Sequence, residues 1–309
     1  MKQSMPCPSL ILGCTHLRLL CDMRLDLPPQ FTEETIFEFL SMLIHRGAPR
    51  DLKVQVNFNT LHFIDPVGQV TLSNTIGWLQ KKGVKVTFLA PDTTNPAVRF
   101  LDDAQFFSSH LKNHQTILPA AHLRETTLPI TRIQHSQAGH WLRGTFVHWM
   151  AERTEIPVPS LVSIQSSLME IFNNIKDHSE EQIGCCAAQH FPKNRRIIIA
   201  IADFGVGIPT QMSKKYHGSN SDLIMQACDE GVSTKSIPQN RGAGLYLLVQ
   251  NVVRLNHGMI SIYSNDGKAT FGTLNNHHKP SKFYPGTLFI VIFDTDTIVP
   301  DEEEDFQWS

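Results

Sequence analysis

Apolar and polar residues recur at helical or strand spacing along most of the chain, and this pattern predicts helices and strands in alternation. In the first third, helices are predicted over 31–45, 69–83 and 95–107, and strands over 52–65 and 84–90. Thr32 is the expected N-cap of the first helix, and Asn95 followed by Pro96 marks the start of the third. Short joints between the elements indicate an α/β unit.

The second half shows the same two periodicities. Helices are predicted over 160–178 and 242–258, and strands over 195–203, 259–265 and 286–294. Residues 204 to about 240 read as a turn followed by a polar stretch, and 108–160 contain one predicted helix, over 140–153. The predicted organisation is an α/β domain (1–115), a partly helical connecting segment (116–158), a second α/β domain (159–297) and an acidic tail (298–309).

One predicted helix carries polar residues beside its buried face. Its apolar stripe is formed by Ile164, Leu168, Ile171 and Ile175, while Glu170, Asn174 and His178 follow one another at intervals of four residues. This spacing places a carboxylate, a carboxamide and an imidazole in one row at the edge of the stripe. The simpler alternative is a helix whose polar residues face solvent.

Composition limits the classes of protein to consider. The chain has 309 residues, of which 41% are hydrophobic and 18% charged, and its net charge is −2. This size allows two domains, and the charge lacks the basic excess typical of nucleic-acid or membrane-surface binding. No apolar run approaches the ~20 residues of a membrane span, and the apolar stretch near the start is shorter than the ~7–15 residues of a signal-peptide core. A cytoplasmic protein is the prediction.

The six cysteines include no C-x-x-C pair, so reduced thiols in a cytosolic protein are the simpler interpretation. The even spacing of Cys7, Cys14 and Cys21, close to His16, leaves a metal site as an alternative.

Four short motifs follow one another in the second half. They are E-I-F-N-N in a helix at 170–174, D-F-G-V-G after a strand at 203–207, R-G-A-G-L before a helix at 241–245, and G-T at 286–287. A dinucleotide fingerprint would need a third glycine where Leu247 stands, so a Rossmann domain is not supported. Over about 160–295, their order and spacing resemble the ATP-binding domain shared by gyrase B, heat-shock chaperones, histidine kinases and MutL. This GHKL or Bergerat fold is an α/β sandwich.

The resemblance implies roles for the first two motifs. Asn174 would bind Mg²⁺ through its hard carbonyl oxygen, and Glu170 would act as general base on the attacking water or hydroxyl. Asp203 would accept a hydrogen bond from the adenine amino group, helped by Thr287 through a bound water. Guanine presents a carbonyl at that point, so ATP should bind better than GTP.

The remaining candidate residues match positions that surround the nucleotide in the related domains. Gly205 and Gly207 would let the backbone pass close to the base. Gly242, Gly244 and Leu245 open a helix whose free N–H groups would face an anion. The preceding polar loop resembles the family's mobile lid, and its candidate nucleotide-binding residues are Thr234, Lys235 and Arg241, of which Lys235 or Arg241 would touch the γ-phosphate. Solvent-facing charge is the alternative for this loop.

Two residues indicate which branch of this family the chain resembles. Sensor histidine kinases usually carry Asn where this chain has Glu170, whereas Glu is typical of the ATP-hydrolysing members and of anti-sigma-factor serine kinases. His178 is also similar to the serine-kinase branch, so it joins the candidate nucleotide-binding residues. We therefore discount a sensor histidine kinase.

Residues 50–107 resemble the anti-sigma-antagonist (STAS) domain, which is a partner of that kinase branch. In STAS domains the residue after the aspartate is commonly the phosphorylated serine, whereas here Asp65 is followed by Pro66. Phosphorylation at that position is therefore excluded. A generic α/β partner domain is the alternative.

Two functions of different class remain from the sequence. In the first, the chain cleaves ATP with Mg²⁺, as an ATPase or a serine/threonine protein kinase, and regulates a partner protein. In the second, it is a nucleotide-gated interaction module with little turnover. Glu170 favours the first, because binding alone needs no base. The identity of the protein partner and the existence of a homodimer are left open, and neither a nucleic acid nor a membrane is expected as a partner.

Overall fold

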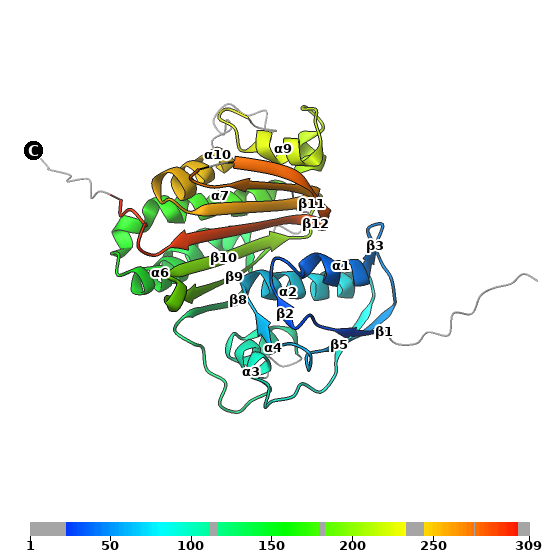
Figure 1. The fold of residues 1–309 in the computed structure, drawn as a ribbon. Helices are drawn as coiled ribbons and strands as arrows, with labels where there is room; N and C mark the ends of the chain where they lie inside the picture. The colour runs from blue at the N-terminus through cyan, green and yellow to red at the C-terminus, as the bar shows by residue number, and fades with distance from the viewer. Residues whose placement is uncertain (1–22, 112–115, 179–182, 233–243, 275, 302–309) are drawn as a thin grey trace, which may run out of the picture.

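The computed structural model describes residues 23–111, 116–178, 183–232, 244–274 and 276–301. These residues form an α/β structure with a three-stranded sheet, a five-stranded sheet and two two-stranded pairs. The predicted α/β class is therefore confirmed. Figure 1 shows the larger sheet between a group of helices and the N-terminal part of the chain. Among the described helices, none combines the length and apolar character needed to cross a bilayer.

The N-terminal part is built around a parallel sheet in the order β1-β5-β7. Its strands are β1 (Met23–Asp26), β5 (Lys53–Asn57) and β7 (Lys85–Phe88), and its helices are α1 (Ile36–Leu43), α2 (Pro66–Lys81), α3 (Pro96–Asp103) and α4 (Phe106–His110). The two short pairs are β2 (Gln30–Phe31) with β6 (Phe63–Ile64), and β3 (Ile44–His45) with β4 (Ala48–Pro49). Parallel neighbours require crossover connections, and the helices between the strands supply them.

The observed starts of the helices agree only in part with those predicted from N-cap residues in the sequence. Asn95 caps α3 with its side chain, as predicted. Asp65 caps α2, which begins at Pro66 and therefore three residues before the predicted start. The prediction for α1 was wrong, because its N-cap is Thr35 and not Thr32: Thr35 N donates to Thr32 O across a turn that delays the helix.

The five-stranded sheet has the order β11-β12-β10-β9-β8, and all its neighbouring strands are antiparallel. The strands are β8 (Thr127–Gln134), β9 (Ile183–Phe191), β10 (Arg196–Asp203), β11 (Met259–Phe271) and β12 (Asn276–Asp294). The sequence did not predict β8 or β9. Residues 185–188 of β9 are small and all buried, so apolar–polar alternation is missing. Pro129 interrupts the pattern of β8, which tolerates proline because it is an edge strand with a register shift there.

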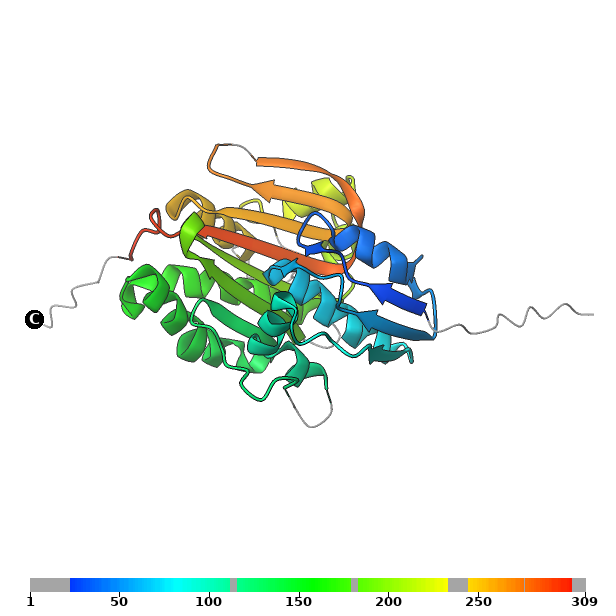
Figure 2. The same ribbon diagram turned by 60° about the horizontal axis from the view of Figure 1, so that its bottom comes forward.

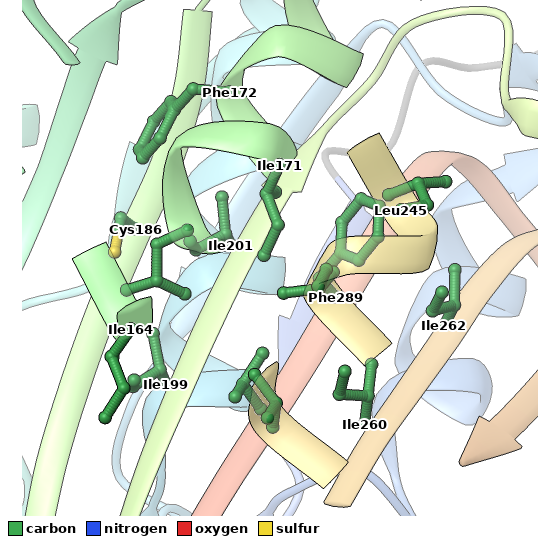
Figure 3. Packing of buried hydrophobic residues seen from close by; sticks show 14 of the residues in the cluster. Ile164, Ile171, Phe172, Cys186, Ile199, Ile201, Leu245, Ile260, Ile262 and Phe289 are labelled. Atoms are coloured by element: carbon green, nitrogen blue, oxygen red, sulfur yellow. The ribbon is translucent and has the colours of Figure 1, made fainter. Parts of the chain in front are cut away.

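Helices cover one face of this sheet. They are α5 (His135–Trp141), η2 (Leu142–Phe146), α6 (Val147–Thr154), η3 (Val158–Leu161), α7 (Val162–His178), α10 (Gly244–Val249) and η6 (Gln250–Leu255). Residues assigned by sequence to a connecting segment therefore supply β8 and three helical elements of this layer. Figure 3 shows Ile164 and Ile171 of α7 and Leu245 of α10 packed with side chains of the strands, among them Ile201 of β10 and Phe289 of β12.

The polar stretch after β10 also contains regular structure. It forms α8 (Ile208–Met212) and α9 (Asn220–Ala227), where the sequence predicted no element. Ser219 and Asp222 make a reciprocal capping box at the start of α9, and this helix packs against β11. The local cap chemistry and the contact with β11 stabilise a helix too short to show a clear apolar period.

The opposite face of the sheet is covered by the N-terminal part. Helix α2 packs against β9 and β10, and one buried cluster runs from the parallel sheet through α2 into these strands. Figure 1 shows the N-terminal part, in blue and cyan, on the side of the sheet away from α7, and Figure 2 shows the two parts still adjacent after rotation. The two parts of the chain therefore share a core and do not form separately packed units.

Candidate functional site

Asp203 is the last residue of β10 and lies in the interior with a polar neighbour opposite. Its partner across the antiparallel ladder is Thr287 of β12, and the two residues are 3% and 1% exposed. The amide of Gly205 donates to Asp203 Oδ1 at 2.5 Å. Burial raises the pKa of the Asp203 carboxyl to about 7, against the lowering effect of this hydrogen bond. A carboxylate predicted at a strand end is thus a buried acceptor beside a buried hydroxyl.

Two glycines allow the backbone to fold tightly around this pair. Gly286 has φ +84°, and a Cβ there would lie 2.3 Å from the carbonyl oxygen of Asp203. Gly207 also has φ +84°, and its Cβ would lie 2.7 Å from Ser264 Oγ. Any side chain at either position would be strained by the backbone angle and by this contact. Gly207 and Gly286 therefore allow the backbone to pass close to Asp203 and Ser264, directly after the end of β10.

Ser264 organises the same region and was missed by the sequence analysis. Its hydroxyl donates to Gly286 O at 2.8 Å, accepts from Ile208 N at 3.0 Å, and lies 3.1 Å from Thr287 Oγ1. Since Ser264 gives its proton to Gly286, Thr287 is the donor in the third contact, and the lone pairs of Thr287 remain as acceptors. A serine inside the apolar strand 259–265 was the available signal.

Glu170 of α7 lies directly against the first residue of α10. A Cβ on Gly244 would be 2.7 Å from Glu170 Oε2, so a larger residue there would require this carboxylate to move. Leu245, the next residue, is 8% exposed and belongs to the core of the helical layer. Glu170 of the first motif and Gly244 of the third therefore meet in space, and the side chain of Leu245 serves packing.

Two adjacent asparagines in α7 differ in their hydrogen bonds. Asn173 Oδ1 is 2.9 Å from Nε2 of His135. Asn174 Oδ1 is buried and has no hydrogen-bond partner among the described residues. A buried carbonyl oxygen without a partner is costly. Asn174 therefore carries a free hard-oxygen acceptor one helical turn beyond Glu170.

The end of α7 and the region around Asp203 lie at the same edge of the helical layer and the five-stranded sheet. Helix α7 ends at His178 and β9 begins at Ile183, while Cys185 of β9 pairs with Ala202 of β10. The carboxyl end of α7 and the carboxyl end of β10 thus lie at the same edge of the two layers. A Cβ on Gly184 would lie 2.8 Å from Ile175 of α7, which confirms the close approach.

Several predicted site residues cannot be placed. Thr234, Lys235, Arg241 and Gly242 lie outside the described residues, as do the cysteines of the alternative metal site, and His178 is placed only through its backbone at the end of α7. Among the residues that the structure describes, no three His, Cys, Asp or Glu side chains form a potential metal cluster. No protein-family model matches the chain, and a search of the curated proteins also found no match.

Proposed function

We propose that the five-stranded sheet and its helical layer form a GHKL-type domain that binds ATP with Mg²⁺ and cleaves it. The observation that carries this proposal is the buried Asp203–Thr287 pair beside a glycine turn, at the edge where α7 ends. An antiparallel sheet with helices on one face also suits this fold. The N-terminal part is proposed to be STAS-like, in keeping with its parallel sheet and crossover helices.

Base recognition follows from the acceptors at the site. Ionised Asp203 presents only acceptors, and Thr287 retains acceptor lone pairs because its proton goes to Ser264. An exocyclic amine such as that of adenine can donate to these groups. Guanine would set a carbonyl against them, and an unsatisfied buried acceptor costs ~1–3 kcal/mol. The site should therefore prefer ATP to GTP by roughly 5- to 150-fold.

Asn174 is the proposed protein ligand for Mg²⁺. Its orphaned Oδ1 suits a hard cation, which takes oxygen ligands and completes its shell with phosphate oxygens and waters. Bound Mg²⁺ would neutralise charge on the phosphates during their transfer. The contribution of the chain is one oriented amide oxygen on a helix held rigidly by its apolar stripe.

Glu170 is the proposed general base. Its carboxylate would accept the proton of a water or a substrate hydroxyl while that oxygen bonds to the γ-phosphorus and the bond to ADP breaks. Water as nucleophile gives an ATPase, and a serine or threonine of a protein partner gives a kinase. Gly244, packed against the carboxylate, keeps this position free of another side chain.

A nucleotide-gated interaction module is the second candidate. The N-terminal part packs directly on the strand that ends in Asp203, so occupancy of the site could change the exposed surface of that part. In that case the chain would bind ATP and release little phosphate, whether alone or with a protein partner in the cytoplasm.

Calorimetry on the full chain tests the proposal. We expect Mg²⁺-dependent binding of ATP, weak binding of GTP, and loss of this preference in Asp203→Asn, because an amide can present a donor as readily as an acceptor. Equal binding of ATP and GTP by the wild-type protein, or binding of neither, would contradict it.

A further inference from the structure

The residue after Asp203 makes contacts on the other side of the sheet. Successive side chains of a strand point to opposite faces. Along β10, Ile199 and Ile201 belong to the helix-covered core, whereas Ala200 and Ala202 belong to the core shared with the N-terminal part. By the same alternation, Asp203 faces the helix-covered side of the sheet. Phe204, just past the strand end, packs with the core shared with the N-terminal part.

Phe204 is held there by two aromatic rings, and we call Trp78, Phe204 and Tyr284 the aromatic bridge. The rings of Phe204 and Trp78 make an edge contact with centroids 6.3 Å apart and planes at 73°. The rings of Phe204 and Tyr284 make a second edge contact, with centroids 5.7 Å apart and planes at 85°. Trp78 belongs to α2 and Tyr284 to β12, so the bridge joins the N-terminal part to the strand end.

Helix α2 has a defined position on the sheet. Arg132 Nη2 of β8 donates to the carbonyl oxygen of Ser73 at 3.0 Å. A Cβ on Gly77 would lie 2.6 Å from that guanidinium nitrogen, so a larger residue there would displace the Arg132 side chain. Both contacts lie in the turn of α2 that precedes Trp78.

The contact between α2 and Tyr284 is polar. Burial raises the pKa of the Tyr284 hydroxyl, while hydrogen bonds with the side chains of Thr71 and Asn74 of α2 lower it. Since the ring of Tyr284 also contacts Phe204, these polar contacts tie the position of α2 to Phe204 by a second route.

We propose that Trp78 and Phe204 are positioning residues through which helix α2 controls the placement of the Asp203 carboxylate, and hence nucleotide selectivity. One peptide unit joins the ring held by α2 to the carboxylate on the opposite face. A shift of α2 changes the support of Phe204 and the turn in which Gly205 N binds Asp203. By linkage, a nucleotide on Asp203 also favours one position of α2. The selectivity part of this inference rests on the proposed function.

The first arm of the experiment needs no nucleotide. Hydrogen–deuterium exchange of peptides covering 203–209 would be compared in full-length wild type, Trp78→Ala, Trp78→Phe and Gln80→Ala, the last changing an exposed residue of the same helix. We expect exchange about 10-fold faster in Trp78→Ala, recovery in Trp78→Phe, and no change in Gln80→Ala. Unchanged exchange in folded Trp78→Ala would overturn the mechanical link.

The second arm measures the ratio of ATP to GTP affinity in the same proteins. We expect Trp78→Ala to reduce this ratio at least 5-fold and Trp78→Phe to restore it, an effect that a general loss of stability would not produce. If wild type binds no nucleotide, the proposed function fails while the exchange result still decides the link. If wild type binds ATP selectively and Trp78→Ala retains the full ratio, the control of selectivity is overturned.

Discussion

The two faces of the five-stranded sheet are both buried, yet they differ in construction. Toward α7, β10 presents the large side chains Ile197, Ile199 and Ile201, followed by Asp203. Toward α2, the same strand presents Ala200 and Ala202, which let a helix approach closely, followed by Phe204. One face is an ordinary apolar core that ends in a polar site, and the other is a close contact between a helix and a sheet.

Polar groups on the two faces also differ in how they are satisfied. Around Asp203, a backbone amide and the Ser264 hydroxyl supply short, directed hydrogen bonds. At the contact with α2, the partners are side chains: the buried hydroxyl of Tyr284 interacts by hydrogen bonds with Thr71 and Asn74. The comparison indicates a site built on backbone groups on one face and, on the other, a helix attached through side-chain contacts.

The largest expected effect tests whether chemistry belongs to the helix-covered face. Glu170→Gln keeps the size of the side chain and removes its proton acceptor, so single-turnover ATP cleavage should slow by ~10²–10⁴-fold. ATP affinity should stay within a few fold. Thr71→Val, on the other face, is the matched control and should retain the wild-type rate. Wild-type cleavage by Glu170→Gln, or no cleavage by wild type with any partner, would favour the nucleotide-gated module.

The second effect concerns pH and stability. The pKa of Asp203 is raised to about 7 in the folded protein, against ~3.9 in the unfolded chain, so the folded state binds this proton more tightly. Its contribution to the free energy of unfolding is complete below pH ~4 and is lost as pH rises to ~7, a decline of roughly 4 kcal/mol. Asp203→Asn should remove this decline.

Urea unfolding between pH 4 and 8 would measure this decline. Asp65, at the cap of α2, provides a comparison in the N-terminal part, because burial raises its pKa to about 6 and the sign is the same. Asp65→Asn should remove a smaller decline that ends about one pH unit lower. Identical pH profiles for wild type and Asp203→Asn would show that the carboxyl is not protonated in the folded protein near neutral pH.

Asn174→Ala tests whether Asn174 Oδ1, which has no hydrogen-bond partner among the described residues, binds Mg²⁺. Loss of a residue that only supports a metal ligand commonly costs ~10–100-fold in metal affinity, so we expect loss of the ligand itself to lower ATP affinity by at least about 10-fold, and only when Mg²⁺ is present. Calorimetry with Mg²⁺ and with EDTA separates the two conditions. Asn173→Ala is the control, because its oxygen already has His135 as a partner. Equal losses in both variants would point to a disturbed helix.

A pair of hydroxyl deletions compares the two faces directly. Ser264→Ala removes a group with three polar contacts and should destabilise the protein by ~1–3 kcal/mol. Thr71→Val removes a single hydrogen bond, to Tyr284, and should cost less, ~0.5–1.5 kcal/mol. Chemical denaturation of both variants gives the difference. A larger loss in Thr71→Val than in Ser264→Ala would contradict this ranking of the two faces.

The smallest expected effect is the absence of a phosphoswitch in the N-terminal part. Pro66 has no hydroxyl, and the nearby Thr71 and Ser73 are 0% and 1% exposed, so a kinase could not reach them in the folded protein. Mass spectrometry of peptides spanning 60–75 after incubation with ATP should find no phosphate. Phosphate on either hydroxyl would show that α2 leaves the sheet.

The sequence by itself determined the elements whose periodicity is strong. Helix α7, strand β10 and the carboxyl half of β12 lie where the 3.6- and 2-residue patterns predicted them, because each buries a full apolar face. It also placed Asp203 and its glycine turn correctly, since local geometry decides a strand end. Strands β8 and β9 were missed, because small residues and an edge proline hide the alternation that marks a strand.

Tertiary structure alone decided which residues meet. Ser264 contacts Gly286 and Thr287 only because of the register between β11 and β12, and that register shifts at a bulge that no local pattern reveals. The contact of Phe204 with Trp78 depends on α2 crossing from one sheet to the other, over more than a hundred residues of chain. Sequence periodicity states which face a residue occupies, but the neighbour on that face is set by packing between distant segments.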